Sequence, residues 1–176
     1  MSGGLLGFKA RNHPQQLALR GTREDVDDRG TSPVVFDPLD ERFSFTLDVA
    51  ASPHNAKVPR YLTRDSDGLA AAWAGERVWC NPPYSDIRAW VDKAWNEWSS
   101  PTPPLLIVML LPANRTEQAW WQDMVEPYRD RPGSPLRTEY LRGRLRFIRH
   151  GLGHDEIQPN ERPPFGCCLL IWSINT

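Results

Sequence analysis

The sequence predicts a single α/β domain, built on a mostly parallel sheet that ends in an antiparallel pair of C-terminal strands. Three observations predict this fold. Short apolar runs alternate with segments of helical spacing between residues 43 and 125, which is typical of α/β proteins. The apolar runs at 140–148 and 165–174 are separated only by a Gly- and Pro-rich loop, which favours an antiparallel pair. A length of 176 residues suits one compact core.

The domain is expected to span residues 31–176 and to follow a flexible arm at 1–30, which is polar, Gly-rich and without sustained periodicity. No apolar run is long enough for a membrane-spanning helix, and the N-terminus lacks the apolar stretch of a secretory signal. We therefore expect a cytoplasmic protein with no membrane partner. The sequence carries no signal for an oligomeric state.

Two prolines and one acidic residue characterise the first half of the domain. Pro33 follows a serine and opens a helix, which Pro38 is expected to keep short. Asp48 lies near the carboxyl end of a run rich in aromatic and β-branched residues, which predicts a strand. The expected elements are a helix at 33–40, a strand at 43–50, an extended piece at 60–63, a brief helix at 68–73 and a strand at 77–80.

The second half begins with an amphipathic helix, because apolar residues from Ile87 to Trp98 follow helical spacing. A buried strand follows between prolines. The expected elements are a helix at 86–98, a strand at 105–111, a helix at 116–125 and strands at 140–148 and 165–174.

The three cysteines indicate neither a disulfide framework nor a metal site. Cys80 ends an apolar run, and Cys167 and Cys168 are adjacent, so on a strand they face opposite sides as small hydrophobes. His150 and His154 are four residues apart, but the glycines between them argue against a helical metal pair. We expect no metal.

The tetrapeptide Asn81-Pro82-Pro83-Tyr84 lies between a predicted strand and the amphipathic helix, where ligands sit in open α/β sheets. Two prolines stiffen this loop, so that the side-chain oxygen of Asn81 and the carbonyl of Pro82 become fixed acceptors beside the ring of Tyr84. Such acceptors bind the hydrogens of a planar amine and favour its attack on an electrophile. The alternative is a simple turn in a protein with 17 prolines.

Two aspartates are further candidates for ligand binding. Asp48, followed by the small residue Ala50, could accept a hydrogen bond from a ligand amine or hydroxyl, or could act as a cap or turn residue. Asp67 could cap the helix expected at 68–73 or approach a bound nucleoside. Both alternatives remain open for each residue.

The net charge of -1 gives no support to nucleic-acid binding, but the charge is unevenly distributed. Five arginines fall at 137–149 beside one acid, Glu139. Arg142, Arg144 and Arg146 occupy alternate positions and would share one face of the strand expected there. That face is either solvated or contacts phosphates, and the scarcity of acids favours phosphates.

These motifs together resemble the phage-type, Dam-like family of DNA N6-adenine methyltransferases. The matching pieces are TSP at 31–33, FDPL at 36–39, FSFTLDVAA at 43–51, NAK at 55–57, PRY at 59–61, DGL at 67–69, VWCNPPY at 78–84, MLLPA at 109–113 and GRLRF at 143–147. The resemblance therefore covers nearly everything after residue 30.

The resemblance implies a Rossmann-like fold that binds S-adenosylmethionine and methylates a flipped-out adenine of double-stranded DNA, in a bacterial or phage-infected cell. It assigns the motif Asn81-Pro82-Pro83-Tyr84 to the adenine. The cofactor residues would be Thr31, Asp48, Ala50 and Asp67. Two rival functions share these features: a methyltransferase acting on an RNA base or a protein glutamine, and a non-catalytic DNA-binding module of the same fold.

The chain departs from many methyltransferases after the first strand, where it reads Ala-Ala-Ser-Pro at 50–53 instead of a Gly-rich loop. It also lacks room for a separate target-recognition domain. We therefore expect target specificity to come from loops such as 149–164 or from the arm.

Overall fold

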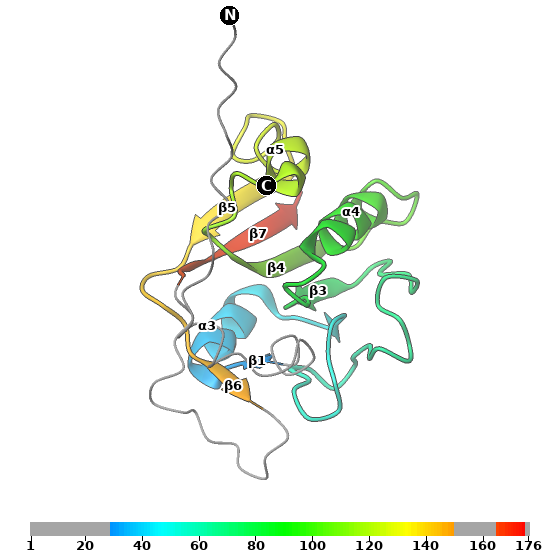
Figure 1. Ribbon diagram of the computed structural model, residues 1–176. Helices are drawn as coiled ribbons and strands as arrows, with labels where there is room; N and C mark the ends of the chain where they lie inside the picture. The colour runs from blue at the N-terminus through cyan, green and yellow to red at the C-terminus, as the bar shows by residue number, and fades with distance from the viewer. Residues whose placement is uncertain (1–28, 150–164, 175–176) are drawn as a thin grey trace, which may run out of the picture.

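A five-stranded sheet forms the centre of the protein, with the strand order β2-β3-β4-β7-β5 (Figure 1). The computed structural model describes residues 29–149 and 165–174. The strands of this sheet are β2 (Leu47–Asp48), β3 (Arg77–Cys80), β4 (Leu106–Pro112), β5 (Leu136–Tyr140) and β7 (Cys167–Ser173). The strands expected at 77–80 and 105–111 are thus confirmed.

The sheet is mixed, and most of its paired residues are antiparallel. β3 pairs parallel to β2 and to β4, whereas β7 pairs antiparallel to β4 and to β5 over longer stretches. The prediction of a mostly parallel sheet was therefore wrong. Because β7 opposes both of its neighbours, β2, β3, β4 and β5 nevertheless run in one direction. The carboxyl ends of β2, β3 and β4 consequently meet at one edge.

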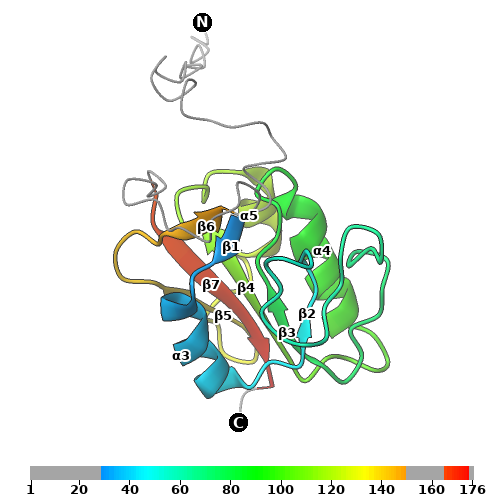
Figure 2. The same cartoon turned by 90° about the horizontal axis from the view of Figure 1, so that it is seen from below.

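Helices cover both faces of the sheet (Figures 1 and 2). The helix α3 (Pro33–Phe43) lies on one face, and α4 (Ile87–Trp98) and α5 (Ala119–Met124) lie on the other. Alternate strand residues enter two separate apolar clusters: Val108 packs with α3, and Met109 packs with α4 and α5. The helix expected at 86–98 is confirmed as α4.

The adjacent cysteines follow the same alternation. Cys167 belongs to the cluster beneath α3, and Cys168 belongs to the cluster beneath α4. The prediction that they face opposite sides is confirmed, and all three cysteines are buried and free.

A two-stranded antiparallel ribbon of β1 (Arg29–Thr31) and β6 (Phe147–Arg149) lies on the α3 side of the sheet (Figures 1 and 2). The strand expected at 140–148 is not continuous, because residues 141–146 leave the strand conformation and Gly143 adopts φ +77°. Tyr140 therefore belongs to β5 of the five-stranded sheet, whereas Phe147 and Ile148 belong to β6 of the ribbon. The final strand β7 pairs with β4 and β5, so the predicted pair of 140–148 with 165–174 was only partly right.

The first predicted helix and strand also needed correction. Helix α3 continues past Pro38 to Phe43, and Ser44 ends it at φ 51° with its N–H on the Asp40 carbonyl. The N–H of Phe45 then donates to Asp40 Oδ1 at 2.8 Å. Residues 43–45 thus complete the helix and its cap, which shortens the strand expected at 43–50 to β2.

The segment between β2 and β3 is mostly irregular. Tyr61 forms a parallel bridge with Asp48, which supports the extended piece expected at 60–63. The brief helix expected at 68–73 is instead a series of turns. Gly68 packs so closely against β2 that a Cβ atom there would lie 2.0 Å from the Val49 carbonyl oxygen, and its own carbonyl accepts the Trp73 Nε1–H at 3.0 Å. This packing holds the segment against the sheet edge without a helix.

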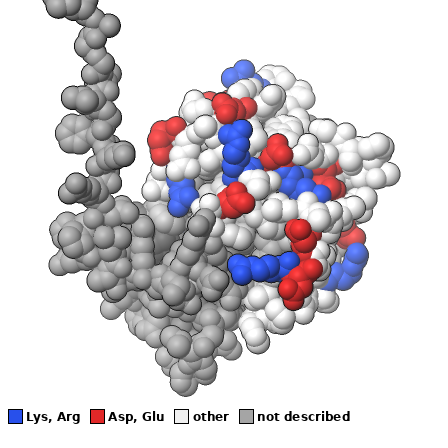
Figure 3. All heavy atoms as spheres, turned by 45° about the vertical axis from the view of Figure 1, so that its right-hand side comes forward, with Lys and Arg blue, Asp and Glu red and all other residues white. Residues whose placement is uncertain are grey.

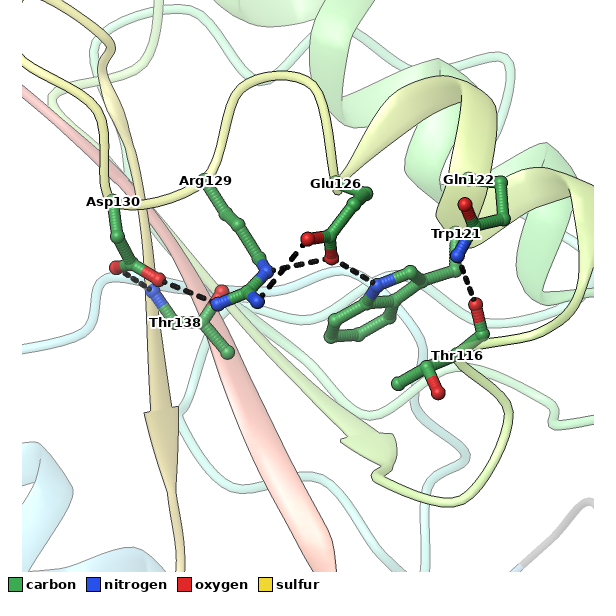
Figure 4. Close-up of polar contacts among 7 residues, drawn as sticks. All are labelled: Thr116, Trp121, Gln122, Glu126, Arg129, Asp130 and Thr138. Carbon is green, nitrogen blue, oxygen red and sulfur yellow. Dashed lines mark hydrogen bonds and ion pairs between the residues drawn. The ribbon is translucent and has the colours of Figure 1, made fainter.

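The connection from α5 to β5 is fixed by a polar network (Figure 4). Arg129 donates to Glu126 at 2.8 Å and to Asp130 at 3.0 Å, and Glu126 also accepts the Trp121 Nε1–H at 2.9 Å. Asp130 accepts the main-chain N–H of Thr138 at 2.9 Å. The network ties the short helix, which is confined to 119–124 rather than 116–125, to the outer strand.

None of the helices in the described part of the chain combines the length and apolar character needed to cross a bilayer. Of the arm expected at 1–30, only Arg29 and Gly30 are described, and both belong to β1. The rest of the arm lies outside the described residues, as does the loop 150–164 to which target specificity was assigned.

Candidate active site

The candidate site lies at the sheet edge where the parallel strands end, the usual ligand position in such sheets. Asp48 ends β2, and Asn81 directly follows β3, which pairs parallel to β2. A small hollow opens here. It is lined by Gly30, Thr31, Asp48, Ala50, Asn55, Lys57, Trp79 and Asn81.

The hollow brings together three of the four predicted cofactor residues, Thr31, Asp48 and Ala50, with the first residue of the tetrapeptide. Sequence reasoning gave no role to four other lining residues: Gly30, Asn55, Lys57 and Trp79. Asn55 and Lys57 lay within the NAK piece of the family resemblance, which was the available signal. Trp79 precedes Asn81 by two positions on β3, and Gly30 reaches the hollow only through the β1–β6 pairing.

Asp48 is a buried carboxylate with main-chain partners. It is 3% exposed, and its Oδ1 and Oδ2 accept the N–H groups of Ala50 at 3.3 Å and Lys57 at 3.0 Å. Burial raises the pKa of Asp48 to about 6, although these two donors and the Lys57 charge oppose the rise. The carboxylate is therefore mostly charged at neutral pH. This charge faces a ligand site from within the protein, a costly arrangement that suits a cationic partner.

Thr31 supplies an unpartnered polar atom to the same hollow. The residue is 1% exposed, and within the described chain its Oγ1 has no hydrogen-bond partner. Buried hydroxyls are nearly always paired, because an unmade hydrogen bond costs about 1–3 kcal/mol. A ligand that donates to or accepts from this hydroxyl would remove the cost, so the hollow fits a polar cofactor.

The tetrapeptide loop is anchored on its C-terminal side. Pro82 is buried, and the Tyr84 ring packs edge-on against Phe147, with 6.1 Å between the ring centroids, and at a tilt against Phe165, with 6.2 Å between the centroids. The Tyr84 hydroxyl is buried beside Cys167, and burial raises the pKa of Tyr84 well above its ordinary value. Tyr84 is therefore a neutral aromatic wall rather than a base.

A second, larger hollow begins at Tyr84, the last residue of the tetrapeptide. It is lined by Tyr84, Ser85, Asp86, Ile87, Arg88, Arg115, Gln118 and Trp120. The two ends of the tetrapeptide thus line different hollows, Asn81 the smaller one and Tyr84 the larger one.

The cysteines are poorly suited to covalent catalysis. Burial raises the pKa of Cys80 well above its ordinary value, and it raises those of Cys167 and Cys168 to about 11 and about 12. Only the thiolate is a good nucleophile, so each of these thiols is inert at neutral pH. In residues 29–149 and 165–174, no three His, Cys, Asp or Glu side chains gather as a metal site requires.

The predicted DNA-contacting arginines lie on the irregular segment between β5 and β6, not on one strand face. Arg142 and Arg144 are exposed, and Arg146 is half-buried. The nearby acid Glu139 is occupied by Arg42, whose two Nη atoms each donate to it at 2.7 Å. Among the described residues, no carboxylate pairs with any of the three arginines. On the face drawn in Figure 3, by contrast, acidic and basic side chains are interspersed.

Asp67 does not line either hollow. Its Oδ1 accepts the N–H groups of Leu69 at 3.0 Å and Ala70 at 3.3 Å. Of the two roles considered for Asp67, this geometry matches the capping role, although it caps a turn instead of a helix.

Comparison with known proteins identifies the family. A family model described as "DNA N-6-adenine-methyltransferase (Dam)" matches residues 20–173. The chain belongs to the Dam family. Its similarity to a DNA N-6-adenine-methyltransferase of Haemophilus phage HP1 reaches 34% identity over 104 residues. That match covers 58% of this chain and 58% of the phage protein, so the chain corresponds to little more than half of that relative's length.

The family match includes every described part of the site. Both hollows, the tetrapeptide and the arginine segment fall within residues 20–173. The buried Asp48 and the unpaired Thr31 hydroxyl therefore lie within the part of the chain that the family model matches.

Proposed function

We propose that this chain transfers a methyl group from S-adenosylmethionine to the N6 amine of an adenine in double-stranded DNA. One observation carries the proposal: a polar hollow containing Thr31 and Asp48 meets the diproline loop at Asn81. Membership of the Dam family supports this reading. We further propose that residues 31–176 form the catalytic domain, with the Rossmann-like use of strand ends to hold the donor.

The donor supplies an electrophilic methyl group on a sulfonium. In the proposed site Thr31, Asp48 and Ala50 bind it in the smaller hollow. Asp67 is left out, because its carboxylate is already used in a turn. The charged Asp48 suits a donor that carries positive charge, and Thr31 gains a partner for its hydroxyl.

The diproline loop acts on the acceptor amine. The lone pair of adenine N6 is delocalised into the ring, which makes it a poor nucleophile. The Asn81 side-chain oxygen and the Pro82 carbonyl accept the two amine hydrogens and thereby favour a pyramidal nitrogen. Pro83 keeps the loop stiff. The N6–CH3 bond forms as the S–CH3 bond breaks, and S-adenosylhomocysteine leaves as a neutral thioether. No base with a tuned pKa is needed, because the amine proton is then acidic and passes to solvent water.

The adenine reaches the loop by leaving the duplex, at a cost of a few kcal/mol. We place its ring at the larger hollow beside Tyr84, with the N6 amine directed along the loop to Asn81 and Pro82. Stacking returns about 1–3 kcal/mol and offsets part of the cost. Arg142, Arg144 and Arg146 contact phosphates of the flanking DNA. Such an enzyme would work in the cytoplasm of a bacterial or phage-infected cell, where this substrate lies.

The test is methyl transfer from labelled S-adenosylmethionine to DNA, RNA and protein, followed by mapping of the modified base. The proposal expects N6-methyladenine in DNA and negligible label in RNA or protein. Label on RNA or on protein glutamine would point to the rival enzymes. Donor and DNA binding without any transfer would point to a non-catalytic module.

A further inference from the structure

Lys57 lines the smaller hollow but takes no part in the contacts proposed above for the donor. Its side chain is half-buried, and its ammonium forms no ion pair with a carboxylate among the residues that the structure describes. Its main-chain N–H, however, donates to Asp48 Oδ2 at 3.0 Å. The carboxylate of Asp48, at the end of β2, and the cationic Lys57 on the following segment therefore line the same cavity.

The electrostatics around Lys57 show that the two charges influence each other without contact. Burial lowers the pKa of Lys57, while the negative charges of Asp48 and Asp37 oppose this change. The Lys57 charge in turn stabilises the ionised form of Asp48. A half-buried ammonium without a contacting counter-ion is costly, so an anionic ligand group would bind there favourably.

The chemistry of the proposed donor indicates which of its groups Lys57 could bind. Its adenine and ribose are neutral, and its sulfonium and α-ammonium are positive. The α-carboxylate is its one anionic group, and it is attached to the same carbon as the α-ammonium. An amino-acid zwitterion thus presents a positive and a negative group side by side. Asp48 and Lys57 offer the complementary negative and positive groups in the same hollow.

We propose that Lys57 binds the α-carboxylate of the donor while Asp48 accepts a hydrogen bond from its α-ammonium. This inference rests on the proposed use of S-adenosylmethionine. In this arrangement the amino-acid end of the donor lies against Asp48 and Lys57, with the nucleoside extending out of the hollow. The unpaired Oγ1 of Thr31 lies in the same hollow and provides a further polar contact.

The test compares two ligands that differ only in the α-carboxylate: S-adenosylmethionine and its decarboxylated form. Calorimetry in the absence of DNA gives their affinities for the wild type, Lys57→Met and Lys57→Arg. The wild type should prefer the intact donor by about tenfold or more, the size expected of a charged hydrogen bond. Lys57→Met should abolish this preference by weakening the intact donor alone, and Lys57→Arg should restore part of it.

Arg60→Met is the matched control, because it removes a positive charge from the same segment. The Arg60 side chain is 68% exposed and is paired with Glu76 at 2.8 Å. The control should keep the wild-type preference. Thermal unfolding of each free variant verifies that it is folded.

Several outcomes would overturn the assignment while leaving the proposed function standing. Equal affinity of the wild type for the two ligands would show that the protein makes no favourable contact with the α-carboxylate. Equal weakening of both ligands by Lys57→Met would give Lys57 a structural role. Unchanged affinity for both ligands with weaker DNA binding would make it a phosphate contact. A wild type that binds neither ligand would instead contradict the proposed function itself.

Discussion

Arg115 holds the tetrapeptide from the neighbouring strand, because its Nη1 donates to the main-chain carbonyl of Tyr84 at 2.9 Å. Arg115 follows β4, whereas Tyr84 follows β3, so the contact links the loops at two adjacent strand ends. The guanidinium also lines the larger hollow. Proline rings stiffen the loop from within, and Arg115 fixes its end from outside.

Replacement of Arg115 by Met should therefore slow catalysis more than it weakens donor binding. A misplacement of about 1 Å can cost about 100-fold in rate, so we expect single-turnover methyl transfer to fall about 10- to 100-fold. The donor dissociation constant should change less than about threefold. Arg115→Lys, which can still donate to the carbonyl, should recover part of the rate. Equal rates for wild type and Arg115→Met would remove Arg115 from this positioning role.

Thr31→Val should have opposite effects on stability and on binding. The near-isosteric change removes the unpaired Oγ1, which should stabilise the free protein by about 1 kcal/mol. That gain corresponds to a rise of about 2–4 °C in the unfolding midpoint. The donor should bind about three- to tenfold more weakly, since it loses one hydrogen bond. Calorimetry and thermal unfolding measure both quantities, and Thr31→Ser should keep wild-type affinity. A variant that is less stable and binds normally would contradict the assignment.

Donor affinity should depend on pH through Asp48. Burial raises the pKa of Asp48 to about 6, so the carboxylate becomes neutral as the pH falls through that value. If Asp48 binds a cationic donor group, affinity is full above pH 6 and is lost below it. Titrations from pH 5 to pH 8 should show this loss in the wild type. Asp48→Asn should bind more weakly at pH 8 and show a flat profile over the same range.

The Asp48 carboxyl should affect the stability of the free protein in the opposite direction: stability should fall as the pH rises. The folded pKa of about 6 exceeds the unfolded value of 3.8, so the folded state binds more protons between these values. This group therefore stabilises the free protein below about pH 4 relative to above pH 6, by about 3 kcal/mol at most. Urea unfolding at several pH values, compared with Asp48→Asn, isolates the contribution. A stability of the wild type that increases relative to Asp48→Asn as the pH rises from 4 to 7 would contradict the sign.

The arginine segment should contribute to DNA affinity in a salt-dependent way. Arg144→Gln removes an exposed cation that has no carboxylate partner in the described chain. If it contacts one phosphate, the slope of log K against log salt should fall by about 0.9. Arg42→Gln is the control, because Arg42 is engaged by Glu139. Equal slopes for Arg144→Gln and wild type would exclude a phosphate contact at this position.

The sequence predicted the elements whose signals are local. The β3–tetrapeptide–α4 unit could be located because a short apolar run, two prolines and an amphipathic helical pattern follow one another within residues 77–98. Asp48 could be placed at a strand end for a similar reason. These features depend on neighbours in sequence, and residue periodicity reports them directly.

The remaining features depend on distant pairings. β1 has only three residues and exists because it pairs with β6, more than a hundred positions away, so periodicity cannot reveal it. Gly30 and Thr31 reach the hollow only through that ribbon. The insertion of β7 between β4 and β5 likewise reverses the expected pairing pattern without any local signal. Gly143 interrupts an alternating run by adopting a left-handed conformation.

The most direct test of the central claim measures methyl transfer to DNA and donor affinity in Asn81→Ala. The claim is that Asn81 and Pro82 hold the acceptor amine next to a donor bound by other residues. Asn81→Ala should therefore lose transfer to adenine while its donor dissociation constant stays within about threefold of wild type. Transfer at the wild-type rate by this variant would contradict the account.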